Sequence, residues 1–187
     1  LSYPYQLTYG RGLCNRLSSE KYKVFADFHD SDGKYVNHLG EDILLDEGTP
    51  IRAIADGKIV QYEYHSGYAS SDDGTSIAAV IEHDLSKKIN LDLRAGDKKS
   101  VSICQICSIY GHIRKSKDYE GERLGWKVGD CVKKGDIIGY INDKNHNGDT
   151  IEHLHFGIRL GGHPCYLVYY GRENSDIPES NVKYFAA

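Results

Sequence analysis

The sequence predicts a mainly β protein whose strands pair antiparallel in a sandwich or a partly closed barrel. Strand-like runs separated by turn residues follow one another from Asp42 onward. The chain has 15 Tyr and 20 Gly, which suits strands joined by tight turns better than packed helices. Helical periodicity is found only around Leu13–Phe25, so we expect few helices.

Six segments carry the strand pattern, with β-branched or aromatic residues between turn signals. Asp56-Gly57 is typical of a tight hairpin between the first two of them. Gly129-Asp130 and Gly135-Asp136 predict turns on either side of Cys131–Lys134. The predicted strands are Thr49–Ala55, Gly57–Tyr64, Ser76–Glu82, Val101–His112, Ile137–Asn142 and Ile151–Leu160.

Faces and loops follow from these strands. Alternation along Val101–His112 places Ser108, Tyr110 and His112 on one face. Loops around a rigid sheet are the usual place of substrate binding. The predicted loops are Tyr35–His38, His65–Thr75 and Asp143–Thr150.

Composition sets outer limits on the function. At 187 residues the chain is long enough for one well-buried domain, which we expect over residues 1–187. A net charge of −4 with interspersed signs excludes a basic field for nucleic acid or anionic lipid. No stretch approaches the roughly 18 apolar residues of a membrane span. The chain lacks Met and begins at Leu1 without a basic or apolar leader, so we expect an exported form whose signal peptide has been removed.

Two short patterns carry metal-binding residue types. His38-Leu39-Gly40-Glu41-Asp42 sets an imidazole and a carboxylate four residues apart. In His153-Leu154-His155-Phe156, two imidazoles lie two residues apart and share one face of a strand. Imidazoles with one carboxylate favour Zn²⁺ over Mg²⁺ or Ca²⁺, which prefer more oxygen ligands. Residue types alone do not say which of His153 and His155 binds the metal.

These residue types predict hydrolysis. A zinc ion with one open position lowers the pKa of its water toward about 7 and polarises a carbonyl. Attack on a peptide bond also needs a group that takes a proton and donors for the oxyanion. His112 and whichever of His153 and His155 is not a ligand are available for these roles.

Five motifs occur together along about Asn37–Arg159. They are His38-x-Gly40-x-Asp42, Pro50–Val60, Tyr110-x-His112, Val128–Tyr140 and His153-Leu154-His155-Phe156. With these five motifs in this order, the chain resembles the lysostaphin-like zinc metallopeptidases of the M23 peptidase family. The resemblance implies a lysostaphin-like β fold (the duplicated hybrid motif type) with zinc held by His38, Asp42 and His155. It also implies that His112 and His153 are catalytic imidazoles that do not bind the metal.

The resemblance further implies a substrate and a location. Members of the family hydrolyse peptide cross-links of bacterial peptidoglycan, so the expected partners are its stem peptides or cross-bridges, in the periplasm or outside the cell. Metal-free relatives only bind peptidoglycan or activate another hydrolase, which is the alternative function. We favour an active enzyme because all five site positions are filled. A structural β domain with incidental histidines is a third reading, which predicts no bound metal.

The chain departs from the family pattern around the expected groove. Asp84–Cys107 is inserted where the family has a short turn, and the loop Asn145–Glu152 lacks the usual run of small residues. We predict that the insert is a hairpin with a polar tip that forms one wall of the substrate groove. The alternative is a solvent-exposed segment far from the zinc that has no role in substrate binding.

The cysteines, one tyrosine and the remaining histidines carry separate expectations. The five cysteines, Cys14, Cys104, Cys107, Cys131 and Cys165, allow one or two disulfides, for example within the insert or between the insert and Cys131 or Cys165. Tyr35 is a candidate oxyanion donor, although a packing role is favoured. The remaining histidines are expected to be solvated or structural, with His146 of interest because its loop leads into His153; they are His29, His65, His83, His146 and His163.

Overall fold

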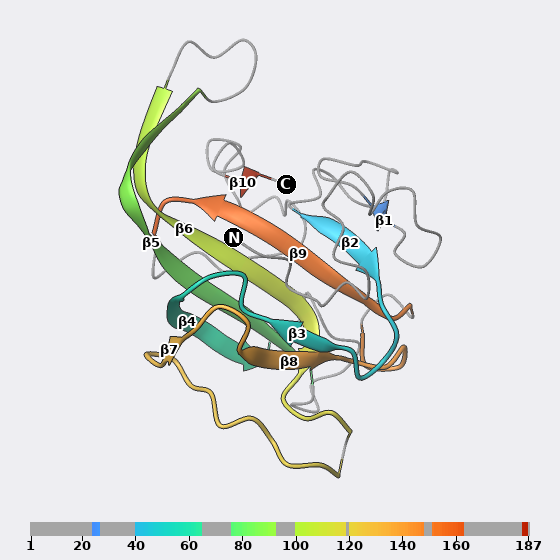
Figure 1. Ribbon diagram of the computed structural model, residues 1–187. Coiled ribbons are helices and arrows are strands. Elements are labelled where there is room, and N and C mark those ends of the chain that lie inside the picture. Colours follow the sequence, from blue (N-terminus) through green and yellow to red (C-terminus); the bar gives the residue numbers. More distant parts are fainter. Residues whose placement is uncertain are drawn as a thin grey trace.

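All regular elements in the described part of the chain are strands of one antiparallel sheet (Figure 1). The computed structural model describes residues 24–26, 40–64, 76–92, 100–118, 120–147, 151–162 and 185–186. In these residues no helix is long and apolar enough to cross a membrane. The strands are β1 (Val24–Ala26), β2 (Glu41–Leu44), β3 (Pro50–Arg52), β4 (Gly57–Tyr64), β5 (Ile77–Asp92), β6 (Ser100–Arg114), β7 (Cys131–Val132), β8 (Ile137–Ile141), β9 (His153–Leu160) and β10 (Phe185–Ala186).

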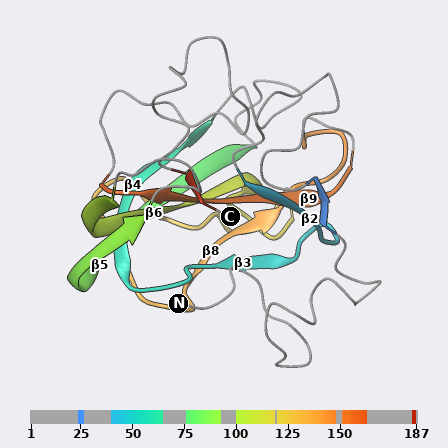
Figure 2. The same ribbon diagram turned by 90° about the horizontal axis from the view of Figure 1, so that it is seen from above.

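The sheet folds over on itself to form two layers. Its main path runs β1-β2-β9-β6-β5-β4-β7, while β8 pairs with both β6 and β3. Figure 2 shows β3 and β8 on one side of β9 and β6. Since β8 meets β6 only at Ile113↔Ile141 and Arg114↔Tyr140, the β3–β8 pair leans across the main sheet rather than extending it. The predicted fold class, a partly closed antiparallel β structure, is confirmed.

The hydrophobic core lies between these two layers. Ile43 of β2, Tyr110 of β6 and Leu154 of β9 are fully buried against Ile51 of β3 and Ile138 of β8. Burying such an aliphatic side chain contributes about 1.5–3 kcal/mol each. This core therefore holds β2, β9 and β6 side by side.

The predicted hairpin at Asp56-Gly57 is wrong. β3 pairs with β8, and β4 pairs with β5 and β7, so the two segments diverge after Arg52. The reason for a glycine here is close packing, because a Cβ on Gly57 would lie 2.5 Å from the Glu82 carbonyl oxygen. The helical periodicity around Leu13–Phe25 does not correspond to a helix at its end, where residues 24–26 form β1; the rest of this segment lies outside the described residues.

Two turns predicted around Cys131–Lys134 are confirmed. Gly129 and Gly135 have φ of 100° and 94°, a region open to glycine at little steric cost. Each turn is closed by the aspartate that follows, since Asp130 and Asp136 accept hydrogen bonds from backbone amides three residues earlier. The short strand β7 is thereby set against β4.

The β5–β6 pair is much longer than the strands beside it. β4 accompanies β5 only as far as Glu82, and β9 accompanies β6 only as far as Ile106. Beyond these residues the two strands pair only with each other in the described part of the chain, as a ribbon that projects from the body in Figure 1. Four residues of β5, 85–88, bulge out opposite Cys104 within it.

Candidate active site

The register of β2 on β9 brings the two metal-binding patterns together. Asp42 lies directly opposite His155, and Leu44 lies opposite His153. Side chains of directly opposed residues share a face, so the Asp42 carboxylate reaches both imidazoles. Its Oδ1 lies 3.0 Å from His155 Nδ1 and 3.8 Å from His153 Nε2. The three side chains are nearly inaccessible to solvent.

Gly40 allows β2 to approach β9 at this point. A Cβ on Gly40 would lie 2.6 Å from the Phe156 carbonyl oxygen and 2.7 Å from His155 Nε2, closer than any real contact. Any other residue would have to displace the imidazole or the strand. The glycine in His38-x-Gly40-x-Asp42 is therefore a steric requirement of the site.

A β-bulge turns His112 toward this cluster. Ala79 pairs with Tyr110 whereas Ile77 pairs with Ile113, so Gly111 and His112 together stand opposite one residue of β5. His112 has φ of 60°, unusual for a residue with a side chain. Such bulges bend a strand and redirect its side chains.

The bulge corrects the prediction that Tyr110 and His112 share a face. Tyr110 points into the core, where its hydroxyl accepts a hydrogen bond from the Ile54 amide at 3.2 Å. Ile113 also points into the core, three residues later instead of two. His112 consequently faces the other way, and its ring lies 4.1 Å from that of His153 between centroids.

Burial keeps the His112 ring neutral, and a hydrogen bond sets the tautomer of the neutral His153 ring. Burial lowers the pKa of His112 well below its usual value, and the neighbouring His153 lowers it further. His153 Nδ1 lies 2.7 Å from the Ile151 carbonyl oxygen, which can only accept, so the proton of the neutral ring sits on Nδ1. Its Nε2 lone pair then faces the Asp42 side of the site.

The β8–β9 loop holds both histidines. The Asn142 amide donates to the His112 carbonyl oxygen at 3.1 Å, and Asn147 Nδ2 donates to that of His153 at 3.3 Å. Sequence reasoning missed both asparagines. The only signal was Asn147-Gly148, a turn dipeptide shortly before His153.

The donor atoms of Asp42 and His155 fit zinc. Ligand atoms at about 2.0–2.2 Å from zinc lie about 3.3 Å apart on neighbouring corners of a tetrahedron, close to the 3.0 Å seen here. His38 lies outside the described residues, and within those residues no group of three or more possible ligands is arranged around one point. The structure therefore places two of the three predicted ligands in contact.

Other predicted residues fall outside the site. His83 is buried and structural, with Nδ1 2.8 Å from the Asp56 carbonyl oxygen and Nε2 2.7 Å from Ser108 Oγ. His146 Nδ1 pairs with Asp143 at 2.8 Å in the β8–β9 loop. Cys104, Cys107 and Cys131 are free, so the predicted disulfides within the insert and to Cys131 are not formed. Tyr35, His29, His65, His163, Cys14 and Cys165 lie outside the described residues.

The described strands of the insert begin far along the sheet from His112, and the groove-wall role stays a prediction. β6 runs six residues from His112 to Ile106, about 20 Å at roughly 3.3 Å per residue, before the projecting ribbon begins. The ribbon then continues away from His112 toward Ser100 (Figure 1). Strand direction alone places these residues at the far end of the sheet.

Comparison with known proteins points to one family. The sequence profile described as "Peptidase family M23" matches residues 36–166. Over 120 residues the chain is 31% identical to glycyl-glycine endopeptidase ALE-1 of Staphylococcus capitis, covering 64% of this chain and 24% of that protein. Over 119 residues it is 30% identical to lysostaphin of Staphylococcus simulans, covering 64% and 17%. The chain thus spans less than a quarter of the length of either relative.

Solved structures give a weaker likeness. The catalytic domain of lysostaphin from Staphylococcus simulans superposes with a TM-score of 0.45 at 22% identity, over 82% of this chain and 90% of that one. A zinc-containing peptidase from Vibrio cholerae gives a TM-score of 0.47 at 22% identity, over 76% and 35%.

Proposed function

Because this chain belongs to Peptidase family M23, we propose that it is a zinc-dependent endopeptidase that hydrolyses peptide cross-links of bacterial peptidoglycan. One observation carries the proposal. The carboxylate of Asp42 and the imidazole of His155 converge on one face of the sheet, and two further imidazoles, His112 and His153, flank them. In a purely structural β domain each of these four buried polar groups would need its own hydrogen-bond partner.

The proposed zinc ligands are His38, Asp42 and His155. A bound zinc ion supplies a Lewis acid that activates water and polarises the scissile carbonyl. Gly40 leaves room for the His155 ring, since a Cβ at this position would clash with His155 Nε2.

The proposed catalytic residues are His112 and His153. A neutral imidazole can take a proton from the attacking water and later return it to the leaving amine. The protonated ring, or the neutral ring through its N–H, can also donate to the oxyanion. With centroids 4.1 Å apart, the two rings cannot both be charged at low cost, which favours one acting as acceptor while the other donates.

Substrate and location follow from the same proposal. Stem peptides or cross-bridges of peptidoglycan are the proposed partners, and the similarity to a protein named glycyl-glycine endopeptidase makes glycine bridges the first substrate to try. Such a substrate requires export to the periplasm or the cell exterior.

The alternative is a non-catalytic envelope protein of the same fold that binds peptidoglycan or activates another hydrolase. Zinc content of the purified protein and digestion of defined muropeptides, with and without chelator, separate the two. The enzyme binds about one zinc per chain and releases products that mass spectrometry assigns to a glycine bridge or a D-alanyl cross-link. A zinc-loaded protein that cleaves neither would overturn the proposal.

A further inference from the structure

We infer that Asn147 is a positioning residue that sets the two imidazoles of His112 and His153 relative to one another. This rests on the proposed function, in which those two rings transfer protons. Asn147 belongs to the β8–β9 loop and has no accessible surface.

Asn147 contacts both histidines at once. Its side-chain Nδ2 donates to the His153 carbonyl oxygen at 3.3 Å, where β9 begins. Its backbone forms a hydrogen bond with the His112 ring. One residue thus links the backbone that carries one imidazole to the ring of the other.

The loop that presents Asn147 is itself tied to the sheet. Asn142 anchors one end by donating through its backbone to His112 and through Nδ2 to Ser76 Oγ at 3.1 Å. Ser76 in turn donates to the His146 carbonyl oxygen at 2.9 Å, immediately before Asn147. The position of Asn147 is therefore set by β5 and β6 as well as by β9.

His112 needs such support because its backbone is unusual. The bulge, at which His112 has φ of 60°, sets the side of β6 from which the side chain leaves, but strand pairing does not fix the rotation of the ring. A contact on the ring itself must supply the missing restraint. Displacements of about 1 Å in a catalytic group are enough to lower a rate about 100-fold.

The other amide atom of Asn147 argues against a purely structural role. Its Oδ1 is buried and has no hydrogen-bond partner among the described residues. A buried, unsatisfied carbonyl oxygen destabilises the folded protein, and an apolar residue would avoid that penalty. The asparagine is explained by its Nδ2, which donates to the His153 carbonyl oxygen, while its backbone contacts the His112 ring.

The test compares Asn147→Ala with Asn145→Ala, the same change on an exposed residue of the same loop. Asn147→Ala should lower kcat on a cross-linked muropeptide by about 10- to 100-fold, with KM and zinc content within about twofold of wild type. Asn145→Ala should leave all three unchanged. Asn147→Asp, which keeps the shape but removes the donor, should also lower kcat and serves if the alanine variant fails to fold.

A second measurement needs neither zinc nor substrate. In metal-free protein, the imidazole NMR signals of His112 and His153 should shift in Asn147→Ala, while those of His83, buried elsewhere in the sheet, should not. Unmoved His112 and His153 signals, or a kcat equal to that of Asn145→Ala, would overturn the inference.

Double variants separate this inference from the proposed function. If the Asn147 side chain acts through His153, which it contacts, then Asn147→Ala should cost little further kcat in a His153→Ala background. Fully additive losses would refute the positioning role. If His153→Ala alone retains full activity, the catalytic assignment fails instead, whatever Asn147 does.

Discussion

The two ends of β6 show what an irregularity in a strand pair can do. Near His112, one extra residue of β6 is accommodated by a bulge between β5 and β9, and the displaced side chain is turned into a buried cluster. In the ribbon, the extra residues 85–88 of β5 are flanked by β6 but by no second strand among the described residues, and Lys87 and Lys88 are exposed. The same kind of defect thus builds a site only where strands on both sides enclose it.

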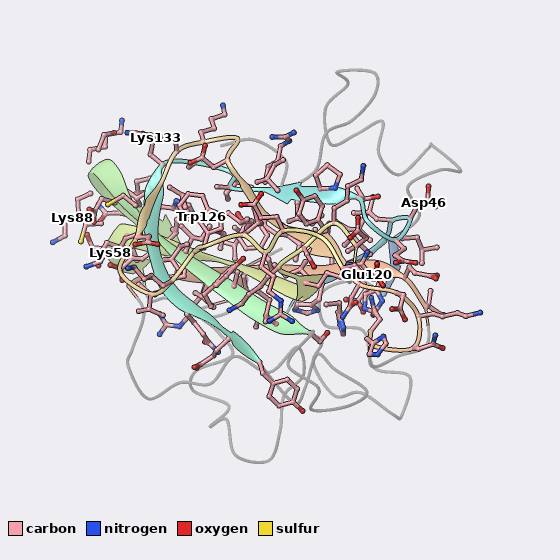
Figure 3. All side chains as sticks on the ribbon, turned by 90° about the horizontal axis from the view of Figure 1, so that it is seen from below. Asp46, Lys58, Lys88, Glu120, Trp126 and Lys133 are labelled. Carbon is pink, nitrogen blue, oxygen red and sulfur yellow. The ribbon has the colours of Figure 1, made fainter. Side chains whose placement is uncertain are left out.

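Charged side chains lie at both of these ends. Figure 3 labels Lys58, Lys88 and Lys133 toward one end of the molecule, and Asp46 and Glu120 toward the other. Lys133 is paired with Asp56 at 2.9 Å on an exposed surface, an interaction of little energetic weight. We therefore expect chemistry at the His112 end and tolerance of change at the ribbon end, and five predictions test this contrast.

The largest effect is expected from Asp42→Ala compared with Asp84→Ala in the ribbon. Asp42→Ala removes the carboxylate that contacts His155, so the protein should purify with substoichiometric zinc. Activity should fall at least about 10³-fold, because several kcal/mol of charge stabilisation is lost. Asp84→Ala should keep both the zinc content and the activity of wild type. Full zinc occupancy in Asp42→Ala would remove this residue from the metal site.

His112→Ala and His153→Ala come next. Each should lower kcat by about 10²- to 10⁴-fold, the usual contribution of a positioned acid–base group. Metal analysis should find zinc near the wild-type level in both. If His153→Ala loses zinc while His155→Ala keeps it, the assignment of the pair is inverted.

Gly40→Ala tests the close approach of β2 to β9. The new Cβ would crowd His155 Nε2, so zinc affinity should fall about 10- to 100-fold, as for other residues that orient a ligand. Gly125→Ala is the matched control, because a Cβ there meets nothing within 4 Å. Competition with a chelator measures the zinc affinity of each variant. Equal affinities would show that β2 can shift to accommodate the new Cβ without disturbing His155.

His83 lies where the body of the sheet gives way to the ribbon, and it should make stability depend on pH. Burial lowers the pKa of His83 in the folded state below the unfolded value of about 6.5. The unfolded chain then binds more protons as pH falls below about 6.5, so the free energy of unfolding decreases there. Urea titrations at about pH 7.5 and pH 5 should show a smaller decrease in His83→Asn than in wild type. Equal decreases would mean that His83 protonates freely when folded.

The smallest effect is expected from shortening the ribbon. Replacing Asn90–Lys99 with a short Gly-Ser turn leaves the pairing of β5 with β6 near His112 intact, so zinc content should not change. The kcat/KM on each muropeptide should stay within about twofold, the range of substitutions that touch no functional group. A changed cross-link preference would support the groove-wall role that strand direction argues against.

Local pattern accounts for much of the fold. Gly57–Tyr64 has the same bounds as β4, and the predicted Ile137–Asn142 exceeds β8 by one residue. These strands are recognisable because alternation and turn glycines are properties of neighbouring residues. The pairing partners of a strand are not recognisable in this way. Asp56-Gly57 has the residues of a hairpin, yet β3 and β4 pair with other strands, because the core between the layers outweighs the local preference.

The sequence by itself determined the strand pattern, the residue types of the site and the two-residue spacing that puts His153 and His155 on one face. Only the tertiary structure decided that Asp42 lies opposite His155, since register depends on how two distant strands bury their apolar faces together. It also decided the direction of His112. Simple alternation would send that ring into the core beside Tyr110, and a bulge enforced by the pairing of β6 with β5 and β8 sends it to His153 instead.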